Sequence, residues 1–329
     1  MRSLLFHRIV KPKVPTNLHS YATASKQTEP STFSIFNRNT KRLQKDRSAS
    51  DVESSRQVDY IKDEIAYRIV DRLLDIKRKF EVVVDLGSGC GHVVKHIDGD
   101  LIGNISQRSH DITEKMLNRD KDVKYDVEVE RMILDEESLP FEENTLEAVL
   151  SNLSLHWVND LPGAMIQIRR SLKPDGVFLA SMFGGDTLFE LRTSLQLAEL
   201  EREGGISPRV SPMTDVRDVG SLLSRAGFTL TTVDVDDLVV NYPTMFELIQ
   251  DLRAMGESNA VITRRPFLKR DTLLAAASIY KELYGKPDET IPATFQIGWK
   301  PDSSQPKPKE RGSAKSSLKE ILEEKDRDQ

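Results

Sequence analysis

The stretch VDLGSGCG at residues 84–91 decides the fold of this 329-residue chain. It completes the β-branched run 82–84, which is typical of a buried strand. Gly87 and Gly89 let the chain turn where a side chain would clash, and a helix is expected to begin near Gly91. Such a turn brings backbone N–H groups close to a nucleotide-like ligand. Taken alone, the same spacing also describes an ordinary tight turn between a strand and a helix.

Around this turn the chain alternates between expected helices and strands. Apolar residues recur with helical spacing over 59–76, ahead of the first strand. Further strands are expected near 101–105, 127–134, 146–152 and 177–183, with helices after Gly91, from Thr113 and over 160–172 between them. This alternation predicts an α/β fold with a doubly wound, mostly parallel sheet.

Helical insertions are expected at residues 186–227 and 245–285. They contain helices over 188–203, 216–226, 245–256 and 271–284, and strands over 230–240 and 291–299. Gly227 ends the second of these helices in the manner of a C-terminal cap. Residues 59–299 are therefore predicted to form one domain with an added helical cover. Residues 300–329 are expected to be a flexible polar tail.

The charge is distributed unevenly along the chain. There are 47 Lys+Arg against 52 Asp+Glu, yet residues 1–50 hold ten basic and two acidic residues. The remainder is strongly acidic, which argues against nucleic acid as a partner. No apolar run reaches the roughly 18 residues of a membrane span. The single cysteine, Cys90, excludes an internal disulfide and a Cys-rich zinc module.

Residues 1–32 have the composition of a mitochondrial transit peptide. Arg2 and Arg8 stand among apolar residues, no acid precedes Glu29, and Ser, Thr and Ala gather at 20–25. A disordered tail with an accidental basic bias is the alternative. Residues 33–58 are expected to remain as a basic, partly ordered arm.

The glycine stretch reads D-x-G-x-G-x-G, which resembles motif I of the class I S-adenosylmethionine (SAM) methyltransferases. LDEESLPF at 134–141 and LKPDG at 172–176 resemble two further segments of that family. The resemblance implies a Rossmann-like SAM fold, with Asp85 beside the methionine end, Asp111 on the ribose and Asp135 on the adenine. The cofactor-binding set that it implies is Asp85, Gly87, Gly89, Gly91, Asp111, Asp135, Glu136 and Ser151.

Longer segments narrow the resemblance. SNLSLHWVNDLP at 151–162 resembles methyltransferases of the biotin-pathway type. Residues 183–205 and 246–259 resemble the mitochondrial arginine hydroxylases that assist assembly of respiratory complex I. This resemblance implies hydroxylation of an arginine in the PSST iron–sulfur subunit, alongside other assembly factors, in the matrix at the inner membrane. Residues 293–300 are shorter than in that family, which predicts either a disturbed ladder or a shifted pairing of the last strand.

Hydroxylation raises the question of the oxygen source, because SAM has no oxygen to give to a C–H bond. Oxygenases usually use iron, often held by two histidines and a carboxylate. His92 and His96 have i, i+4 spacing and could share a metal, although such a pair is more often a half-exposed helical face. The sequence therefore identifies no ligand set for iron, assigns no metal site and names no catalytic residue.

Four residues are candidates for the substrate pocket: His156, Trp157, Asp160 and Asp186. His156 and Trp157 follow the fourth strand at the rim where such sheets bind ligands, and Trp157 could stack on a guanidinium. The alternative is a packed aromatic with a histidine capped by Asn159 or Asp160. Acids such as Asp186 could receive a basic peptide, although such charges are usually solvated. Cys90 is expected to be a small buried residue.

Three functions are consistent with the sequence. The first is an arginine hydroxylase acting on a complex I subunit. The second is a SAM-dependent methyltransferase acting on a protein side chain or a carrier-bound carboxylate. The third is a non-catalytic assembly chaperone.

Overall fold

The computed structural model describes residues 34–76, 78, 80–97, 106–284 and 288–299. It separates Met1–Ser34 from the unit Ile35–Gln329, and the fold below belongs to that second unit. The expected transit peptide, the polar tail and the strand expected near 101–105 lie outside the described residues.

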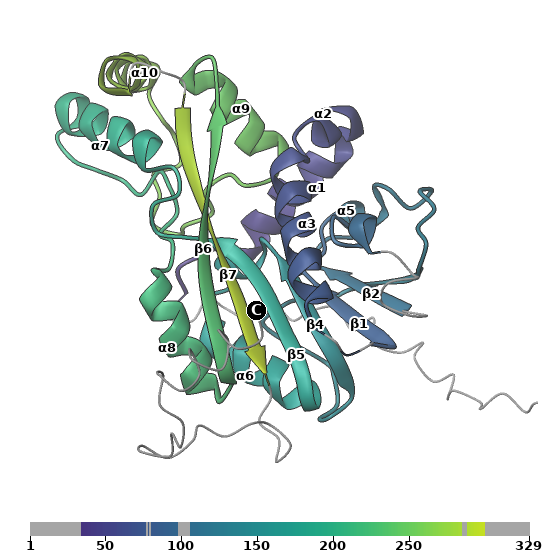
Figure 1. Cartoon of the computed structure of the whole chain (residues 1–329). Coiled ribbons are helices and arrows are strands. Elements are labelled where there is room, and N and C mark those ends of the chain that lie inside the picture. The colour runs from purple at the N-terminus through teal and green to yellow at the C-terminus, as the bar shows by residue number, and fades with distance from the viewer. Residues whose placement is uncertain (1–33, 77, 79, 98–105, 285–287, 300–329) are drawn as a thin grey trace, which may run out of the picture. The chain divides into compact units, whose positions relative to one another are not determined.

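A seven-stranded sheet with the order β3-β2-β1-β4-β5-β7-β6 forms the centre of the fold (Figure 1). The first five strands are parallel, and β7 runs antiparallel to both of its neighbours. The predicted doubly wound, mostly parallel sheet is thereby confirmed. The strands are β1 (Val82–Leu86), β2 (Ser106–Asp111), β3 (Glu128–Ile133), β4 (Leu146–Asn152), β5 (Leu172–Phe183), β6 (Thr229–Asn241) and β7 (Asp288–Trp299).

The last strand, β7, pairs with both of its neighbours. Against β5 it pairs without a break from Phe183↔Ala293 to Val177↔Trp299. Against β6 it pairs from Asn241↔Asp288 onward, with one register shift near Thr229. The short stretch 293–300 predicted either a disturbed ladder or a shifted pairing. The hydrogen-bond ladder between β5 and β7 is continuous over the residues described.

Helices cover both faces of the sheet. On one face α3 (Tyr60–Leu74) buries the predicted stripe that includes Ile61 and Ile69, and Val83 of β1 belongs to the same core. On the other face α6 (Leu161–Ser171) and α8 (Val216–Ala226) pack over a core that includes Val84. Adjacent residues of β1 thus point to opposite faces, as the pleat of a strand requires.

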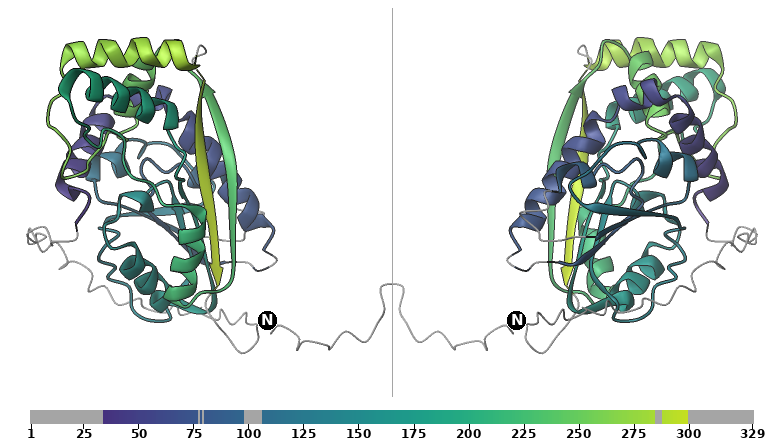
Figure 2. Two further views of the ribbon diagram at one scale, coloured as in Figure 1. Left: turned by 90° about the vertical axis from the view of Figure 1, so that its left-hand side faces the viewer. Right: turned by 90° about the vertical axis from the view of Figure 1, so that its right-hand side faces the viewer.

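The predicted helical cover is formed by α7 (Phe189–Glu203), α9 (Met245–Ala254) and α10 (Arg270–Tyr284). These helices gather beyond one end of the sheet, where α7 and α10 lie side by side (Figure 2). Among the described residues, no helix combines the length and the apolar character that crossing a membrane would need.

The stretch expected to be a basic arm contains two helices. They are α1 (Arg38–Ser50), which begins where the Asn37 side chain accepts a bond from the Thr40 N–H, and α2 (Val52–Gln57). Helix α1 packs against α5 (Glu114–Asn118) and α9. The arm therefore lies against the domain, at the end of the sheet where α5 and α9 are found.

The expectation of a helix beginning near Gly91 is wrong for the residues described there. Turns follow Gly91, and then a single 3-10 turn, η1 (Val94–His96). Gly87, Gly89 and Gly91 all have positive φ angles, so the chain is still reversing where the helix was expected. His92 and His96 consequently do not share an α-helical face.

Candidate functional site

The glycine turn after β1 forms the floor of the candidate site. Gly87 has φ +73°, and a Cβ at this position would lie 2.1 Å from the Ser154 hydroxyl oxygen. Gly89 has φ +57°, and its N–H donates to a carboxylate oxygen of Asp111 over 3.1 Å. The close approach at Gly87 leaves no room for any side chain. The sequence correctly placed Asp111 beside this turn.

Asp111 lies at the end of β2 and is fully buried. One oxygen accepts from the backbone and hydroxyl of Thr113, over 3.0 and 3.2 Å. The other accepts from the Gly89 N–H and from Lys45 Nζ, which is 2.9 Å away. This carboxylate is the acid that the resemblance assigns to the ribose of SAM.

Asp85 ends β1 beneath the same turn and is also fully buried. One oxygen accepts from the Gln107 amide over 3.2 Å, while the other finds no partner among the described residues. Burial, reinforced by the nearby charge of Asp111, raises the pKa of Asp85 to about 8. The unpaired acceptor fits the amino group of a SAM molecule, which the resemblance places here.

Asp135 and Glu136 follow β3 and meet Arg38 of α1. Arg38 Nη2 donates to Asp135 over 2.8 Å and also bonds Glu136, whose other oxygen accepts from the Ser154 hydroxyl over 2.7 Å. Burial opposes the charge on Glu136, but Arg38, Lys45 and the Ser154 bond outweigh it and lower its pKa to about 2. The carboxylates of Asp135, which the resemblance assigns to the adenine, and of Glu136 are therefore both paired within the chain.

Helix α1 presents a basic face to this site. Arg38, Lys41 and Lys45 recur at spacings of three and four residues, so they lie along one face of the helix. Arg38 and Lys45 bond the acids that the resemblance assigns to SAM. Sequence reasoning treated the segment as a charged arm and missed this face, although its helical spacing was a readable signal.

The cavity at the glycine turn has a volume of about 20 Å³. That is room for about one water molecule, whereas a pocket for a small ligand measures at least about 300 Å³. Lys45 of α1 lines it together with Gly87, Gly89 and Glu257. SAM therefore does not fit the volume that is open at this turn.

Trp157 is buried, and the amine of Lys41 from the same chain lies over its ring. Lys41 Nζ lies 3.3 Å from the centre of its ring, and the Trp157 Nε1–H donates to Glu257 over 2.7 Å. Lys41 also donates to the carbonyls of Gly256 and Ser258. The partner predicted for the Trp157 ring, a substrate guanidinium, is thus replaced here by Lys41.

His156 lies in the interior beside the rings of Trp157 and Phe183. Its Nε2 is 3.5 Å from Glu257, and burial lowers its pKa. The alternative in which Asn159 or Asp160 caps this histidine is wrong, because the Asn159 side chain binds the backbone N–H of Phe36 instead.

Three predicted site residues have other roles in this structure. Ser151 is buried and donates to the Leu86 carbonyl over 2.8 Å, which joins β4 to β1 and leaves no hydroxyl hydrogen for a cofactor. Asp160 is exposed and caps α6 by accepting from the Gly163 N–H. Asp186 is exposed and lines neither of the two cavities described here.

Cys90 of the glycine turn is buried, with its thiol 3.3 Å from the sulfur of Met116. Burial raises its pKa to about 12. The thiol therefore stays protonated and unreactive at neutral pH, as the sequence led us to expect.

A second, larger cavity of about 210 Å³ adjoins the first, and Met255 and Glu257 line both. Sequence reasoning missed Glu257. It follows α9, where Gly256 has φ +77° and the Glu257 N–H returns to the Leu252 carbonyl. This reversal directs the chain back toward the sheet, and the Glu257 side chain is buried there.

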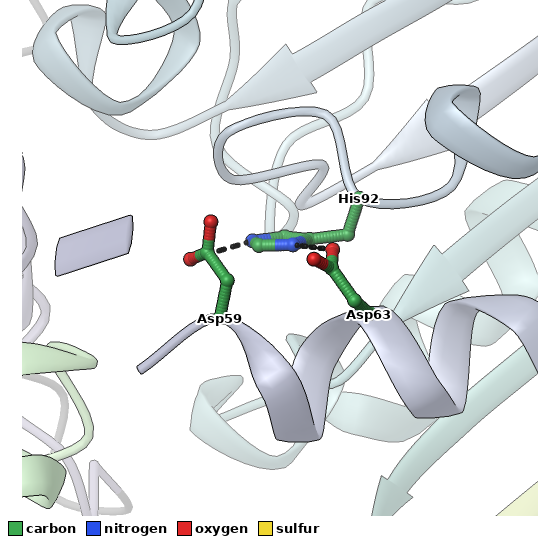
Figure 3. Close-up of side chains that lie close together, drawn as sticks. All are labelled: Asp59, Asp63 and His92. Atoms are coloured by element: carbon green, nitrogen blue, oxygen red, sulfur yellow. Dashed lines mark hydrogen bonds and ion pairs between the residues drawn. The ribbon is translucent and has the colours of Figure 1, made fainter. Parts of the chain in front are cut away.

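Within the described part of the chain, one group of side chains has metal-ligand chemistry: Asp59, Asp63 and His92 (Figure 3). Both carboxylates flank the His92 ring, and Asp63 lies 2.7 Å from its Nδ1. Lys95 pairs with both acids, however, and Arg119 bonds Asp59. Two cations already neutralise the two carboxylates, so this donor set does not fit an iron ion. It joins α3 to the glycine turn instead.

The glycine turn after β1, an acid ending β2 and the sheet order define the class I SAM-dependent methyltransferase fold. Residues 84–180 match the family described as a methyltransferase domain. A putative methyltransferase from Bacillus halodurans has the same fold, with a TM-score of 0.50 and 16% identity over 72% of this chain and 99% of that one.

Within that class, the chain belongs to the family of the mitochondrial arginine hydroxylase NDUFAF5. It is 52% identical over 301 residues to the protein of that name from Mus musculus, covering 90% of this chain and 86% of the mouse protein. A malonyl-[acyl-carrier protein] O-methyltransferase from Halorhodospira halophila is 31% identical, over 73% of this chain and 80% of its own. The predicted family is thereby confirmed.

Proposed function

We propose that this protein hydroxylates an arginine side chain of another protein while SAM occupies the glycine turn. The observation that carries the proposal is the identity of 52% over 301 residues to a relative named arginine hydroxylase. The target is an arginine of the PSST-type iron–sulfur subunit of complex I. The reaction takes place during early assembly with other assembly factors, in the matrix at the surface of the inner membrane.

The residues of the glycine turn would hold SAM. Asp111 would accept from the ribose hydroxyls, Asp85 in its ionised form would accept from the amino group, and Asp135 would accept from the adenine. SAM, when bound, supplies a positively charged sulfonium with an electrophilic methyl group. The side chains of Lys45 and Arg38 now bonded to these acids must first be displaced, which sets an energetic cost on binding.

Hydroxylation replaces a C–H bond by C–O–H and oxidises that carbon by two electrons. Molecular oxygen supplies the inserted atom, while its second atom leaves as water after taking up two electrons and two protons from an external reductant. The protein binds the arginine and excludes water from it. No step is assigned to iron, because the acids beside His92 are paired with Lys95 and Arg119.

Mass analysis of the PSST-type subunit tests this function. Subunit isolated from cells that contain the protein should carry one additional oxygen on one arginine, located by fragmentation, and subunit from cells lacking it should not. An identical peptide in both preparations would refute the proposal, and growth under ¹⁸O₂ should label the added atom.

A methyltransferase is the second candidate, favoured by the methyltransferase domain at residues 84–180. Methyl-labelled SAM would then transfer its label to a protein acceptor or to a carrier-bound carboxylate. Transfer without oxygen insertion would establish this function in place of hydroxylation. Assembly of complex I that depends on the protein, while neither product forms, would establish a non-catalytic chaperone.

A further inference from the structure

The larger cavity has the shape and lining of a receptor for one long side chain. Its volume of about 210 Å³ is smaller than the roughly 300 Å³ of a pocket for a drug-sized ligand. The walls come from α3, α7, α9 and the segments that follow α7 and α9, and most are apolar. Among them are Leu188, Leu191, Leu195, Met213, Leu252 and Leu268.

Glu257 is placed where this cavity meets the cavity at the glycine turn, since it lines both. Its Oε1 accepts from Lys62 Nζ over 3.0 Å and its Oε2 from Trp157 Nε1 over 2.7 Å. His156 Nε2 lies 3.5 Å from Oε2 but forms no hydrogen bond, and a carboxylate oxygen accepts about two bonds, so each oxygen keeps one acceptor position beyond Lys62 and Trp157. Two adjacent acceptor positions match the two parallel donors of a guanidinium.

Glu257 is the one acid among the described residues that line the cavity, and the lysines nearest to it, Lys62 and Lys41, lie outside the lining. Among the described residues that line the cavity, the charged side chains are Glu257 and Arg209. Arg209 is committed elsewhere, because it pairs with Glu199 and donates to two backbone carbonyls. Glu257 remains ionised: burial opposes its charge, but Lys62, the contact with His156 and Lys41 hold its pKa well below the usual range.

We infer that the larger cavity receives the side chain of the target arginine, with its aliphatic stem among the leucines and its guanidinium on Glu257. A lysine would present a point charge that uses one acceptor position, whereas the arginine fork uses both. The junction of the two cavities then places the bound side chain next to the cofactor. This inference rests on the proposed function and names the residue that selects its substrate.

Calorimetry on the full chain tests the assignment with three synthetic peptides that differ at one position. The first carries an arginine, the second a citrulline and the third a lysine. Citrulline keeps the size of arginine but is neutral. We expect the wild-type protein to bind the arginine peptide at least tenfold more tightly than the citrulline peptide, with the lysine peptide between them.

The variant Glu257→Gln should bind the arginine and citrulline peptides equally. Glu143→Gln is the matched control, because it makes the same substitution at an exposed acid that lines neither cavity, and it should keep the wild-type preference. Equal binding of the two peptides by the wild-type protein, or a preference that survives in Glu257→Gln, would overturn the assignment.

A second variant covers the case in which Glu257→Gln does not fold. Leu191→Trp fills the apolar part of the cavity from α7, away from the glycine turn. This variant should lower the affinity for the arginine peptide at least tenfold, while its affinity for SAM stays the same. Unchanged peptide binding would count against the cavity. Arginine hydroxylation that continues in both variants would refute this subsite but not the proposed function. A preference that depends on Glu257 without any hydroxylation would refute the function but not the subsite.

Discussion

The two adjoining cavities differ in what fills them. The one at the glycine turn is small and Lys45 of α1 lines it, while Asp111 and Asp135, which the resemblance assigns to SAM, are paired with Lys45 and Arg38. The other is about ten times larger, mostly apolar, and contains a single carboxylate among its described lining residues. The first is a polar site that must open, and the second is already open.

Two buried acids near the cavities differ in protonation state: Asp85, beneath the glycine turn, and Glu257, which lines both cavities. Asp85 has no cation bonded to it and faces the charge of Asp111, so its pKa rises to about 8. Glu257 is bonded by Lys62 and Trp157, and its pKa falls well below the usual range. Equal burial therefore gives opposite charge states, because the neighbours decide which form is stabilised.

The largest effect on SAM affinity is expected at the floor of the smaller cavity. Gly87→Ala would place a Cβ 2.1 Å from the Ser154 oxygen at a φ of +73°. We expect the free energy of unfolding to fall by about 3 kcal/mol and SAM affinity to fall more than a hundredfold, measured by chemical denaturation and calorimetry. Gly185→Ala is the control, since nothing lies within 4 Å of its added Cβ. Normal SAM binding by Gly87→Ala would show that SAM does not use this turn.

A pH series on stability should separate the two buried acids. Between pH 4 and pH 8 the folded protein keeps a proton on Asp85 that the unfolded chain loses, so this group destabilises the fold as pH rises through that range. Asp85→Asn should remove this pH dependence, and its stability relative to wild type should change by about 4 kcal/mol between pH 5 and pH 8.

Glu257→Gln should change the pH dependence of the free energy of unfolding with the opposite sign to Asp85→Asn. The pKa of Glu257 is depressed in the folded protein, so its contribution is present above the unfolded value and is lost as pH falls. Urea denaturation at several pH values measures both differences. Parallel pH profiles for the two variants would contradict the contrast between the acids.

A smaller effect is expected from replacing Lys45, which lines the smaller cavity. Lys45→Met removes the ammonium that competes for Asp111, which keeps its bonds from Gly89 and Thr113. We expect SAM to bind about tenfold more tightly, equivalent to about 1.4 kcal/mol, as measured by calorimetry. Arg42→Met, an exposed position on the same helix, should leave the affinity unchanged. Weaker binding in Lys45→Met would mean that this lysine assists SAM.

The sequence predicted the cofactor side far better than the substrate side. The glycine turn and Asp111 could be placed from local spacing, because a strand, a tight turn and the next strand end fix them together. Glu257 could not, because it joins Lys62 and Trp157 across separations of 195 and 100 residues that no local pattern records. Asp160 accepts a capping bond from Gly163 and Asp186 is exposed, and their roles in a substrate pocket remain predictions.

The central claim is that arginine is presented to the cofactor site through the larger cavity by Glu257. Fragment mass spectrometry of the PSST-type subunit, from cells in which each variant replaces the wild-type protein at equal abundance, tests it most directly. We expect full hydroxylation of the target arginine with wild type and Glu143→Gln, and one tenth or less with Glu257→Gln. Full hydroxylation with Glu257→Gln would contradict the claim.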